Sequence, residues 1–318
     1  MMRRTLLSAA LALPATARAQ VWSPSRPVTI VVPFPPGGST DVTARNLAER
    51  MAPRLGVSML IDNKPGAQTV IGAEAVARAQ PDGHTILMAS GSTLTIMPLV
   101  GRNLPYRVED FAPVAHVATL PFVIAVRPGI PDTIPEFVAH VRANPGRVTW
   151  GHNGRGSFNH IAGALIQDRL ELDWNDVGYR GDAPQLNDLL AGTLDSILVG
   201  GATGLAAQRT GRARILGWTG ESRLPNLPDQ PTFNDHYPGL VAVTWFGLLA
   251  PARTPQAAIA RLNEAAAAAI RDDSGLRERL LNEGIVTAGG TPAEFQTFLT
   301  REAQRWAPLL RRLDIRLE

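Results

Sequence analysis

The sequence predicts an α/β protein of two lobes, each a mostly parallel sheet flanked by helices, with two strands that cross between them. Buried apolar runs alternate with helical repeats at short spacing, and this alternation starts afresh near residue 131. A late apolar run then precedes a set of terminal helices. We expect lobe 1 to comprise residues 20–122 and 245–318, and lobe 2 residues 123–244. A chain of 318 residues can give each lobe a core of its own.

Residues 1–19 have the three parts of an export signal. Arg3 and Arg4 give a positive start, a short apolar run begins at Leu6, and Ala17-Arg18-Ala19 is a small-x-small cleavage site. The paired arginines also admit twin-arginine export. The apolar run is too short to span a bilayer, and no later segment is long enough. We therefore expect a mature protein in a bacterial periplasm.

Charge and composition exclude several classes of protein. The net charge of +3 comes from the predicted signal, because residues 1–19 hold three arginines and no acid, which leaves 28 basic and 28 acidic side chains. A neutral chain without a basic run does not indicate nucleic acid as a partner. Lys64 is the only lysine and no Walker A motif occurs, which argues against a phosphate site. Without cysteine, the protein is neither a lipoprotein nor a disulfide scaffold.

Lobe 1 begins with a βαβαβ pattern. Its strands are predicted at residues 27–34, 57–62 and 83–90, and its helices at Thr40–Ala52, which Pro53 ends, and Val70–Ala79. The first helix has the apolar spacing of a helix that lies on a sheet. Such units form parallel sheets whose functional loops lie at the carboxyl ends of the strands.

The remaining elements complete the two lobes. Residues 104–129 are predicted to hold two strands that carry the chain out of lobe 1. The strands of lobe 2 are predicted at residues 147–151, 176–181, 195–200 and 213–220. A return strand is predicted at residues 241–251, followed by helices at Pro255–Arg271, Leu276–Glu283 and Pro292–Leu313 that pack back on lobe 1.

The same strand–glycine–helix junction occurs once in each predicted lobe. The first is Pro36-Gly37-Gly38-Ser39-Thr40-Asp41 and the second is Arg155-Gly156-Ser157. Ser39 and Ser157 are both expected to cap their helices, and each helix start offers free N–H donors and partial positive charge to an anion. Facing lobes would then clamp a small diacid, or a carboxylate with a polar far end. The alternative is that both are ordinary turns, for which glycine and serine are good local chemistry.

Other candidates have similar alternatives. Tyr179, Arg180, Gly181 and Asp182 follow a strand and suit either ligand contact or helix capping. Ser90 ends the strand at residues 83–90 and is also taken as a ligand-binding candidate. Arg155 could bind a ligand carboxylate or simply be a solvated loop arginine. Asp195 could bind an amine or cap a turn. "GGATG" at residues 200–204 lacks a full dinucleotide-binding register.

Neither a metal, a cofactor nor catalysis is expected. The six histidines form no H-x-x-x-H pair, and there is no thiol to complete a site. His160, three residues into the second helix, points either into the cleft or into the interior. "GGSTD" and "GRGSF" both lack the last glycine of G-x-S-x-G. A serine that caps a helix is also a poor nucleophile.

Seven segments, over residues 26–313, resemble in order the Bug-type periplasmic receptors of tripartite tricarboxylate transporters. They are "RPVTIVVPFPPGGSTDVTAR", "DNKPGAQTVIGAEAVARAQPDGHTIL", "LPYRVEDFAPVAHV", "GRGSFNHIAGALI", "GYRGDAPQLNDLLAGTLD", "RLPNLPDQPTF" and "WFGLLAPARTPQ". The resemblance implies a two-lobed periplasmic binding protein fold that captures an organic acid. It further implies that backbone N–H groups and waters at Gly37–Asp41 hold a carboxylate. It places Gly156, Ser157 and His160 at the second turn, and Tyr179, Gly181 and Asp182 along the cleft.

The chain departs from the family pattern near the cleft. Gly66-Ala67-Gln68-Thr69 stands where Gly-Ala-Gly-Gly is common, and Phe158 where proline is usual. Arg155 replaces a smaller residue and Met97 an asparagine. Arg155 and Phe158 hint at an aromatic or dicarboxylic ligand, but the ligand cannot be copied from relatives.

The predicted function is that of a monomeric, cofactor-free solute receptor. It would close on a di- or tricarboxylate, an aromatic acid or an acidic amino acid and present it to inner-membrane permease subunits. The alternatives are a sensor that signals to a membrane kinase, and an exported esterase that uses Ser39 or Ser157.

Overall fold

A computed structural model describes residues 22–313, so the predicted export signal lies outside the described residues. Ten strands form a mixed sheet in the order β2-β1-β3-β9-β4-β7-β5-β6, with β8 and β10 both paired to β4. The strands are β1 (Val28–Val32), β2 (Met59–Asn63), β3 (Thr85–Ser90), β4 (Phe111–Val126), β5 (Thr149–His152), β6 (Asn175–Gly178), β7 (Ser196–Gly200), β8 (Arg214–Trp218), β9 (Val243–Pro251) and β10 (Val286–Thr287).

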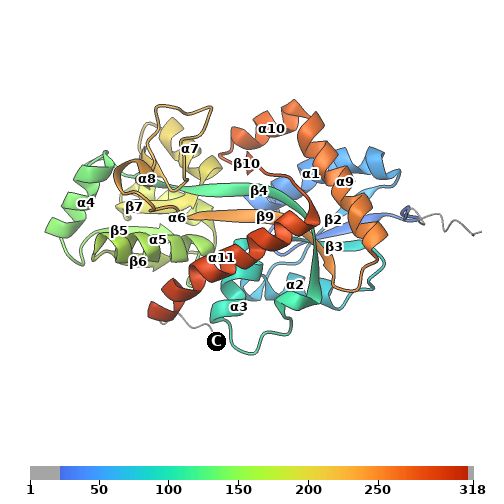
Figure 1. Ribbon diagram of the computed structural model, residues 1–318. Helices are drawn as coiled ribbons and strands as arrows, with labels where there is room; N and C mark the ends of the chain where they lie inside the picture. The colour runs from blue at the N-terminus through green and yellow to red at the C-terminus, as the bar shows by residue number, and fades with distance from the viewer. Residues whose placement is uncertain (1–21, 314–318) are drawn as a thin grey trace, which may run out of the picture.

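Helices cover both sides of this sheet (Figure 1). They are α1 (Ser39–Leu55), α2 (Val70–Ala77), α3 (Met97–Val100), α4 (Ile134–Ala143), α5 (Phe158–Leu170), α6 (Asp182–Ala191), α7 (Gly201–Arg209), α8 (Phe233–His236), α9 (Gln256–Asp272), α10 (Ser274–Leu281) and α11 (Pro292–Arg312). A π-helical turn, Ser92–Ile96, leads from β3 into α3.

The predicted α/β class and the two-lobed arrangement are confirmed. In lobe 1, β1 pairs in parallel with β2 and β3, and in lobe 2, β5 pairs in parallel with β6 and β7. Strand β4 pairs with β9 over Phe111–Pro121 and with β7 over Phe122–Val126, so it belongs to both lobes. Figure 1 shows β4 and β9 side by side between the two groups of helices. The residue boundaries of the lobes stay a prediction.

Two details of the sequence prediction are wrong. Residues 104–129 hold one sixteen-residue strand, β4, where two strands were predicted. Its register against β9 shifts between Pro113 and Ala115 and again between His116 and Ala118, so bulges bend it without breaking it. Helix α1 does not end at Pro53 but continues to Leu55. Its stop is Gly56 at φ +75°, whose N–H donates to the Ala52 carbonyl.

Helix α11 packs on both lobes (Figure 1). Near its start, Phe295 packs against Trp245 of β9, with ring centroids 5.5 Å apart. Three turns later, Trp306 lies 4.9 Å from Phe158, the first residue of α5 in lobe 2. The end of the helix pairs with α5 through an ion pair between Arg312 and Asp168. This helix therefore restrains the lobes on one side of the molecule.

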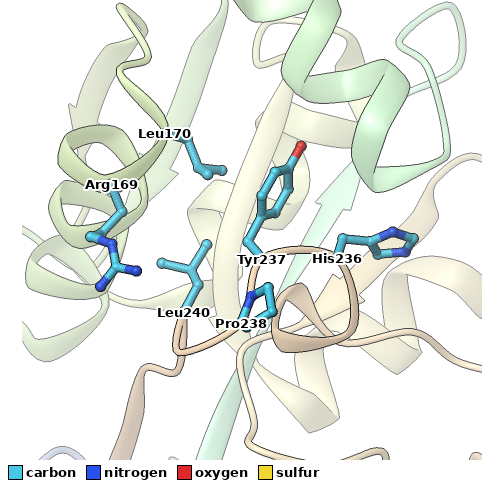
Figure 2. Close-up of a pocket in the computed structure, with 6 residues that line it drawn as sticks. All are labelled: Arg169, Leu170, His236, Tyr237, Pro238 and Leu240. Carbon is cyan, nitrogen blue, oxygen red and sulfur yellow. The ribbon is translucent and has the colours of Figure 1, made fainter.

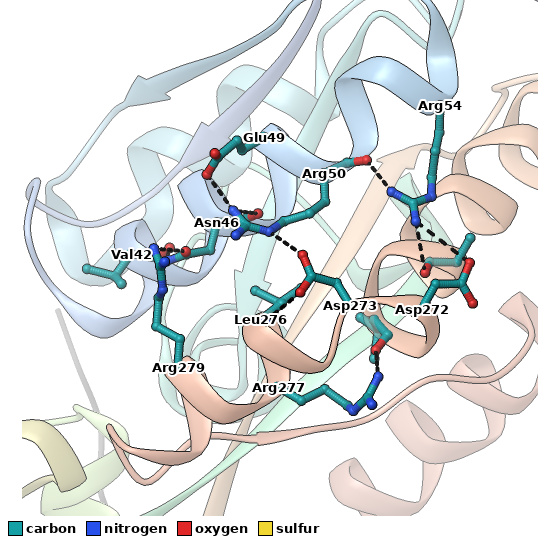
Figure 3. Close-up of polar contacts among 12 residues, drawn as sticks. Val42, Asn46, Glu49, Arg50, Arg54, Asp272, Asp273, Leu276, Arg277 and Arg279 are labelled. Atoms are coloured by element: carbon teal, nitrogen blue, oxygen red, sulfur yellow. Dashed lines mark hydrogen bonds and ion pairs between the residues drawn. The ribbon is translucent and has the colours of Figure 1, made fainter.

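Helix α1 is anchored from behind by α9 and α10 (Figure 3). Arg50 Nε donates to Asp273 Oδ2 at 2.9 Å, and Arg279 donates to Asn46 Oδ1 at 3.2 Å. Asp273 also caps α10, because its Oδ1 accepts the Leu276 N–H at 2.9 Å. These contacts fix the direction in which the N-terminus of α1 points.

Replacing Asp273 should therefore cost more stability than replacing its neighbour. Asp273→Ala removes the α10 cap and the Arg50 partner, and should lower the melting temperature by about 2–4 °C. Asp272→Ala removes an acid from the last turn of α9, where the helix dipole disfavours it, together with its exposed ion pairs to Arg54 at 3.7 Å and to Arg271. Because exposed ion pairs stabilise little, this change should lower the melting temperature less. Circular dichroism melts of both variants check this, and equal losses would show that the anchor does not depend on Asp273.

Candidate functional site

The first junction leads from β1 into α1 through an exposed glycine turn. Gly37 takes a left-handed φ of +85°, and Gly38 is the N-cap in an extended conformation. The expectation that Ser39 caps the helix is wrong, because Ser39 is the first helical residue and its side chain makes no cap bond. The Ser39 carbonyl accepts the Thr43 hydroxyl at 2.7 Å.

The start of α1 presents a row of backbone donors. Val42 N–H bonds the Gly38 carbonyl, which is the first bond of the helix. Within residues 22–313, the N–H groups of Gly38, Ser39, Thr40 and Asp41 donate no hydrogen bond. Free N–H groups at the positive end of a seventeen-residue helix form an anion site without a charged side chain.

Asp41 holds the glycine turn in place. It is buried, and its Oδ2 accepts the Gly37 N–H and Arg45 Nε, each at 2.9 Å. Its Oδ1 accepts the Asn63 amide, also at 2.9 Å. Burial alone would raise the pKa of Asp41, but the hydrogen bonds from Arg45, Gly37 and Asn63 outweigh it and lower that pKa. Both oxygens are engaged by the protein, and the place of Asp41 in ligand contact stays a prediction.

The second junction has the predicted serine cap. Ser157 Oγ accepts the His160 N–H at 3.3 Å and donates to the Gly154 carbonyl at 2.6 Å. Asn159 Oδ1 accepts the N–H of Asn153 at 3.3 Å. The loop therefore turns back on its own side chains, and Gly154 permits this with a left-handed φ of +95°.

Two histidines occupy further amides of this loop. His152 Nδ1 accepts the Gly154 N–H at 3.1 Å, and His160 Nδ1 accepts the Gly156 N–H at 3.3 Å. Most donors of the second loop are thus bonded internally, whereas those at the start of α1 are free. The two junctions share a sequence pattern, but they do not offer the same donors.

The structure brings both junctions to the contact between the lobes. A Cβ on Gly200, at the end of β7, would lie 3.5 Å from Ser39 Oγ and 3.7 Å from Asp182 Oδ2. Gln68 of lobe 1 donates from Nε2 to the Arg155 carbonyl of lobe 2 at 3.4 Å. The first junction therefore faces the end of β7 and the start of α6, and the second faces the loop before α2.

Asp182 is an acid held close to the first junction. It is the first residue of α6, after Gly181, which takes a left-handed φ of +108°. Thr203 Oγ1 donates to Asp182 Oδ2 at 2.9 Å. Burial of the carboxyl group raises the pKa of Asp182, against hydrogen bonds from Asn153, Thr203 and Gly200 that lower it. This carboxyl group can accept a hydrogen bond from a ligand or, when protonated, donate one.

The remaining candidates lie in several environments. Tyr179 donates its hydroxyl to Asp188 Oδ2 at 2.6 Å, and Ser90 is buried with its hydroxyl 3.3 Å from Thr93 Oγ1. The Arg155 side chain is exposed, as is Pro36. Phe158 is 3 % exposed and packs on Trp306, so it belongs to the core and gives no reason to expect an aromatic ligand.

Spatial proximity reveals a group that the sequence spacing did not. His152, His160 and Asp176 have ligand atoms within 4.8 Å of one another, because Asp176 lies on β6 beside β5. His152 Nε2 lies 3.1 Å from Asp176 Oδ2. Both Nδ1 atoms accept backbone N–H groups, which places the imidazole protons on Nε2, the atom that a metal would need bare. This favours a hydrogen-bonding role that holds the second loop.

Sequence reasoning missed four polar residues of this region. Asn153, Asn159 and Gln185 support the second loop, and Thr203 holds Asp182. The signal available for Asn159 was its position two residues after a capping serine. The others come from separate elements and have no local signal.

A surface hollow, whose lining residues are drawn in Figure 2, lies at the end of α5 away from the second junction. Its volume is ≈ 250 Å³, and it is lined by Arg169, Leu170, His236, Tyr237, Pro238 and Leu240. Because Leu170 ends α5 and Phe158 begins it, the hollow lies a helix length away from the second junction.

Comparison with known proteins identifies the family. Residues 43–315 match the model of the tripartite tricarboxylate transporter family receptor. This chain belongs to that receptor family. A protein encoded in the tcbD-tcbE intergenic region of Pseudomonas sp. strain P51 is 37 % identical over 319 residues, covering 97 % of this chain and 93 % of the relative. Protein BugT of Bordetella pertussis is 34 % identical, covering 93 % of this chain and 91 % of BugT.

Solved structures confirm the periplasmic binding protein fold of the receptor. Rpa4515 of R. palustris, determined with adipate, superposes with a TM-score of 0.84 at 30 % identity, over 91 % of this chain and 97 % of that one. MatC of Rhodopseudomonas palustris, with bound malate, gives a TM-score of 0.80 at 31 % identity, over 90 % and 99 % of the two chains. Between residues 22 and 313, the receptor has no helix that is both long and apolar enough to cross a membrane.

The histidine that closes the second loop should make the receptor sensitive to acid. Burial lowers the pKa of His160 from 6.5 to about 4, so the folded state keeps this side chain neutral where the unfolded state takes up a proton. The neutral His160 side chain contributes fully to the free energy of unfolding above pH 6.5. As the pH falls towards 4, up to about 3 kcal/mol of this free energy is lost. Urea denaturation at several pH values should show this loss, reduced in His160→Gln. Equal pH dependence in both proteins would contradict the assignment.

Proposed function

We propose that the receptor binds a small organic carboxylate between its lobes and delivers it to the permease of a tripartite tricarboxylate transporter. The observation that carries this proposal is the row of free N–H groups from Gly38 to Asp41, which faces lobe 2. Two relatives of the same fold have been determined with dicarboxylates, Rpa4515 with adipate and MatC with malate. The ligand carboxylate would accept hydrogen bonds at the start of α1.

The surroundings of Ser39 narrow the ligand class. The Asp182 carboxylate lies, like Ser39, next to Gly200 at the end of β7. It would repel a second negative charge placed next to it, but would accept a hydrogen bond from a hydroxyl or ammonium group. A di- or tricarboxylate therefore fits best when it carries its second acid group away from Asp182. Hydroxy acids and acidic amino acids offer a donor to Asp182, and aromatic acids do not.

Binding and release follow from the charge of the site. Closure of the lobes excludes water, and hydrogen bonds from backbone N–H groups to the carboxylate strengthen inside the closed site. The ligand shifts the equilibrium between open and closed forms only by its difference in affinity for the two. A site built on helix termini has no guanidinium to hold the anion once the lobes part, so release to a permease is not slowed by a salt bridge.

The same geometry supports binding without catalysis. Ser157 Oγ is engaged by the Gly154 carbonyl and the His160 N–H, which suits a helix cap and not a nucleophile. In the described part of the chain, no histidine bonds Ser39. We further propose that the receptor acts as a monomer, without a cofactor, after export to the periplasm and removal of residues 1–19.

A thermal-shift screen of the mature protein tests the proposed function. The panel is di- and tricarboxylates, hydroxy acids, aromatic acids and amino acids, with uncharged amides of the same acids as matched controls. A ligand at one hundred times its Kd stabilises the folded protein by about 2.7 kcal/mol. At least one acid should raise the melting temperature while its amide does not. No shift with any acid, or equal shifts with acid and amide, would contradict the proposal.

The backbone donors can be tested by one substitution. Gly38 has φ −78°, close to the value that proline requires, and a Cβ there would meet only the Pro35 carbonyl at 3.8 Å. Gly38→Pro therefore removes one N–H without forcing the turn, and should weaken carboxylate binding by about 10- to 100-fold. Lys64→Ala, which removes a nearby surface cation, should change affinity less. Isothermal titration measures both, and equal affinities would contradict a site made of backbone donors.

A further inference from the structure

The loop before α2 is a left-handed turn built from residues that disfavour that conformation. Ala67, Gln68 and Thr69 have φ of +45°, +52° and +82°, and each carries a Cβ that crowds the backbone there. Gly66, at φ +128°, is the only glycine of the turn. Three such residues in succession are strained, and strain of this kind persists where the surrounding structure requires it.

Local contacts do not account for this strain. The turn is closed by one backbone bond, from the Thr69 N–H to the Gly66 carbonyl at 3.1 Å. Thr69 is buried, yet its hydroxyl finds no partner within residues 22–313. The hydrogen bonds within residues 66–69 therefore do not explain why residues 67–69 are not glycine.

The contact that the turn does provide is between the lobes. Gln68 is exposed, and its Nε2 donates to the Arg155 carbonyl in the second junction at 3.4 Å. The same nitrogen lies 3.7 Å from the position of a Cβ on Gly154. The acceptor is a backbone carbonyl, so the contact depends on where the loop lies and not on the Arg155 side chain.

The second junction meets lobe 1 at another point, and the two contacts differ in character. A Cβ on Gly91 would lie 2.6 Å from the Phe158 ring, which is buried against Trp306. That contact is apolar and continuous with the core, so it persists while the protein is folded. The Gln68 contact is polar and open to water, which can replace it when the lobes move apart.

We propose that Gln68 is a latch that holds the Gly154–Arg155 loop against lobe 1 and biases the receptor towards its closed form before any ligand arrives. The inference rests on the lobe closure of the proposed function. The backbone strain of residues 67–69 lies within lobe 1, whereas the Gln68 hydrogen bond joins the two lobes and breaks when they move apart. Its loss therefore shifts the balance towards the open form. A single hydrogen bond at the surface corresponds to about a 2- to 10-fold change in the closed-to-open ratio.

Single-molecule fluorescence energy transfer on the ligand-free mature protein tests the latch. The chain has no cysteine, so Arg78→Cys on lobe 1 and Asn187→Cys on lobe 2 give a unique pair of labelling sites. Gln68→Ala and Gln68→Gly should both lower the closed-to-open ratio by about 2- to 10-fold. Gln68→Gly should also raise the melting temperature by about 2 °C, because glycine relieves the left-handed strain.

Glu171→Gly is the matched control for strain. Glu171 is the C-cap of α5, at φ +51°, and makes no bond to lobe 1 among the described residues. Its replacement should raise the melting temperature by a similar amount and leave the closed-to-open ratio unchanged. An unchanged ratio in both Gln68 variants, or an equal shift in Glu171→Gly, would overturn the latch. Because no ligand is added, a shift specific to Gln68 supports the latch even if the thermal-shift screen finds no acid.

Discussion

The site depends on one buried carboxylate, Asp41. By accepting the Gly37 N–H within the loop, it bends the chain so that the following amides point outward, and Arg45 and Asn63 hold it in position. An acid in the first turn of a helix is itself favoured by the helix dipole. Asp41 therefore gives the turn its shape, while the N–H groups from Gly38 onwards remain free for an anion.

The lobes contribute unequally to this site. Lobe 1 offers free backbone donors, whereas the corresponding loop of lobe 2 uses its amides on His152, His160 and Asn159. Lobe 2 instead brings Gly200, with Asp182 next to it, up to Ser39. Lobe 1 would then bind the charged group of the ligand, while lobe 2 would determine specificity for the ligand's shape and its hydrogen-bond donors. Such a division suits a receptor that must release its ligand when the lobes separate.

Much of the fold could be predicted from the sequence, because apolar periodicity and glycine punctuation are local signals. Such local signals mark the parallel strands of each lobe, the return strand β9 and the terminal helices. The single strand β4 could not be predicted, since no local signal shows that bulged pairing with β9 carries one strand through the whole segment. The role of Ser39 was misjudged for a similar reason, because Gly38 and Ser39 are both good caps in isolation. The contacts of Gln68, Thr203 and Asp176 join distant elements, and no sequence pattern gives them.

The most direct measurement of the central claim is the position of the ligand in a crystal structure of the receptor with its tightest-binding acid. One carboxylate of that acid should lie at the start of α1, with its oxygens roughly 2.7–3.2 Å from backbone nitrogens of Gly38–Asp41. A carboxylate bound instead by an arginine side chain, or seated outside the contact between the lobes, would contradict it.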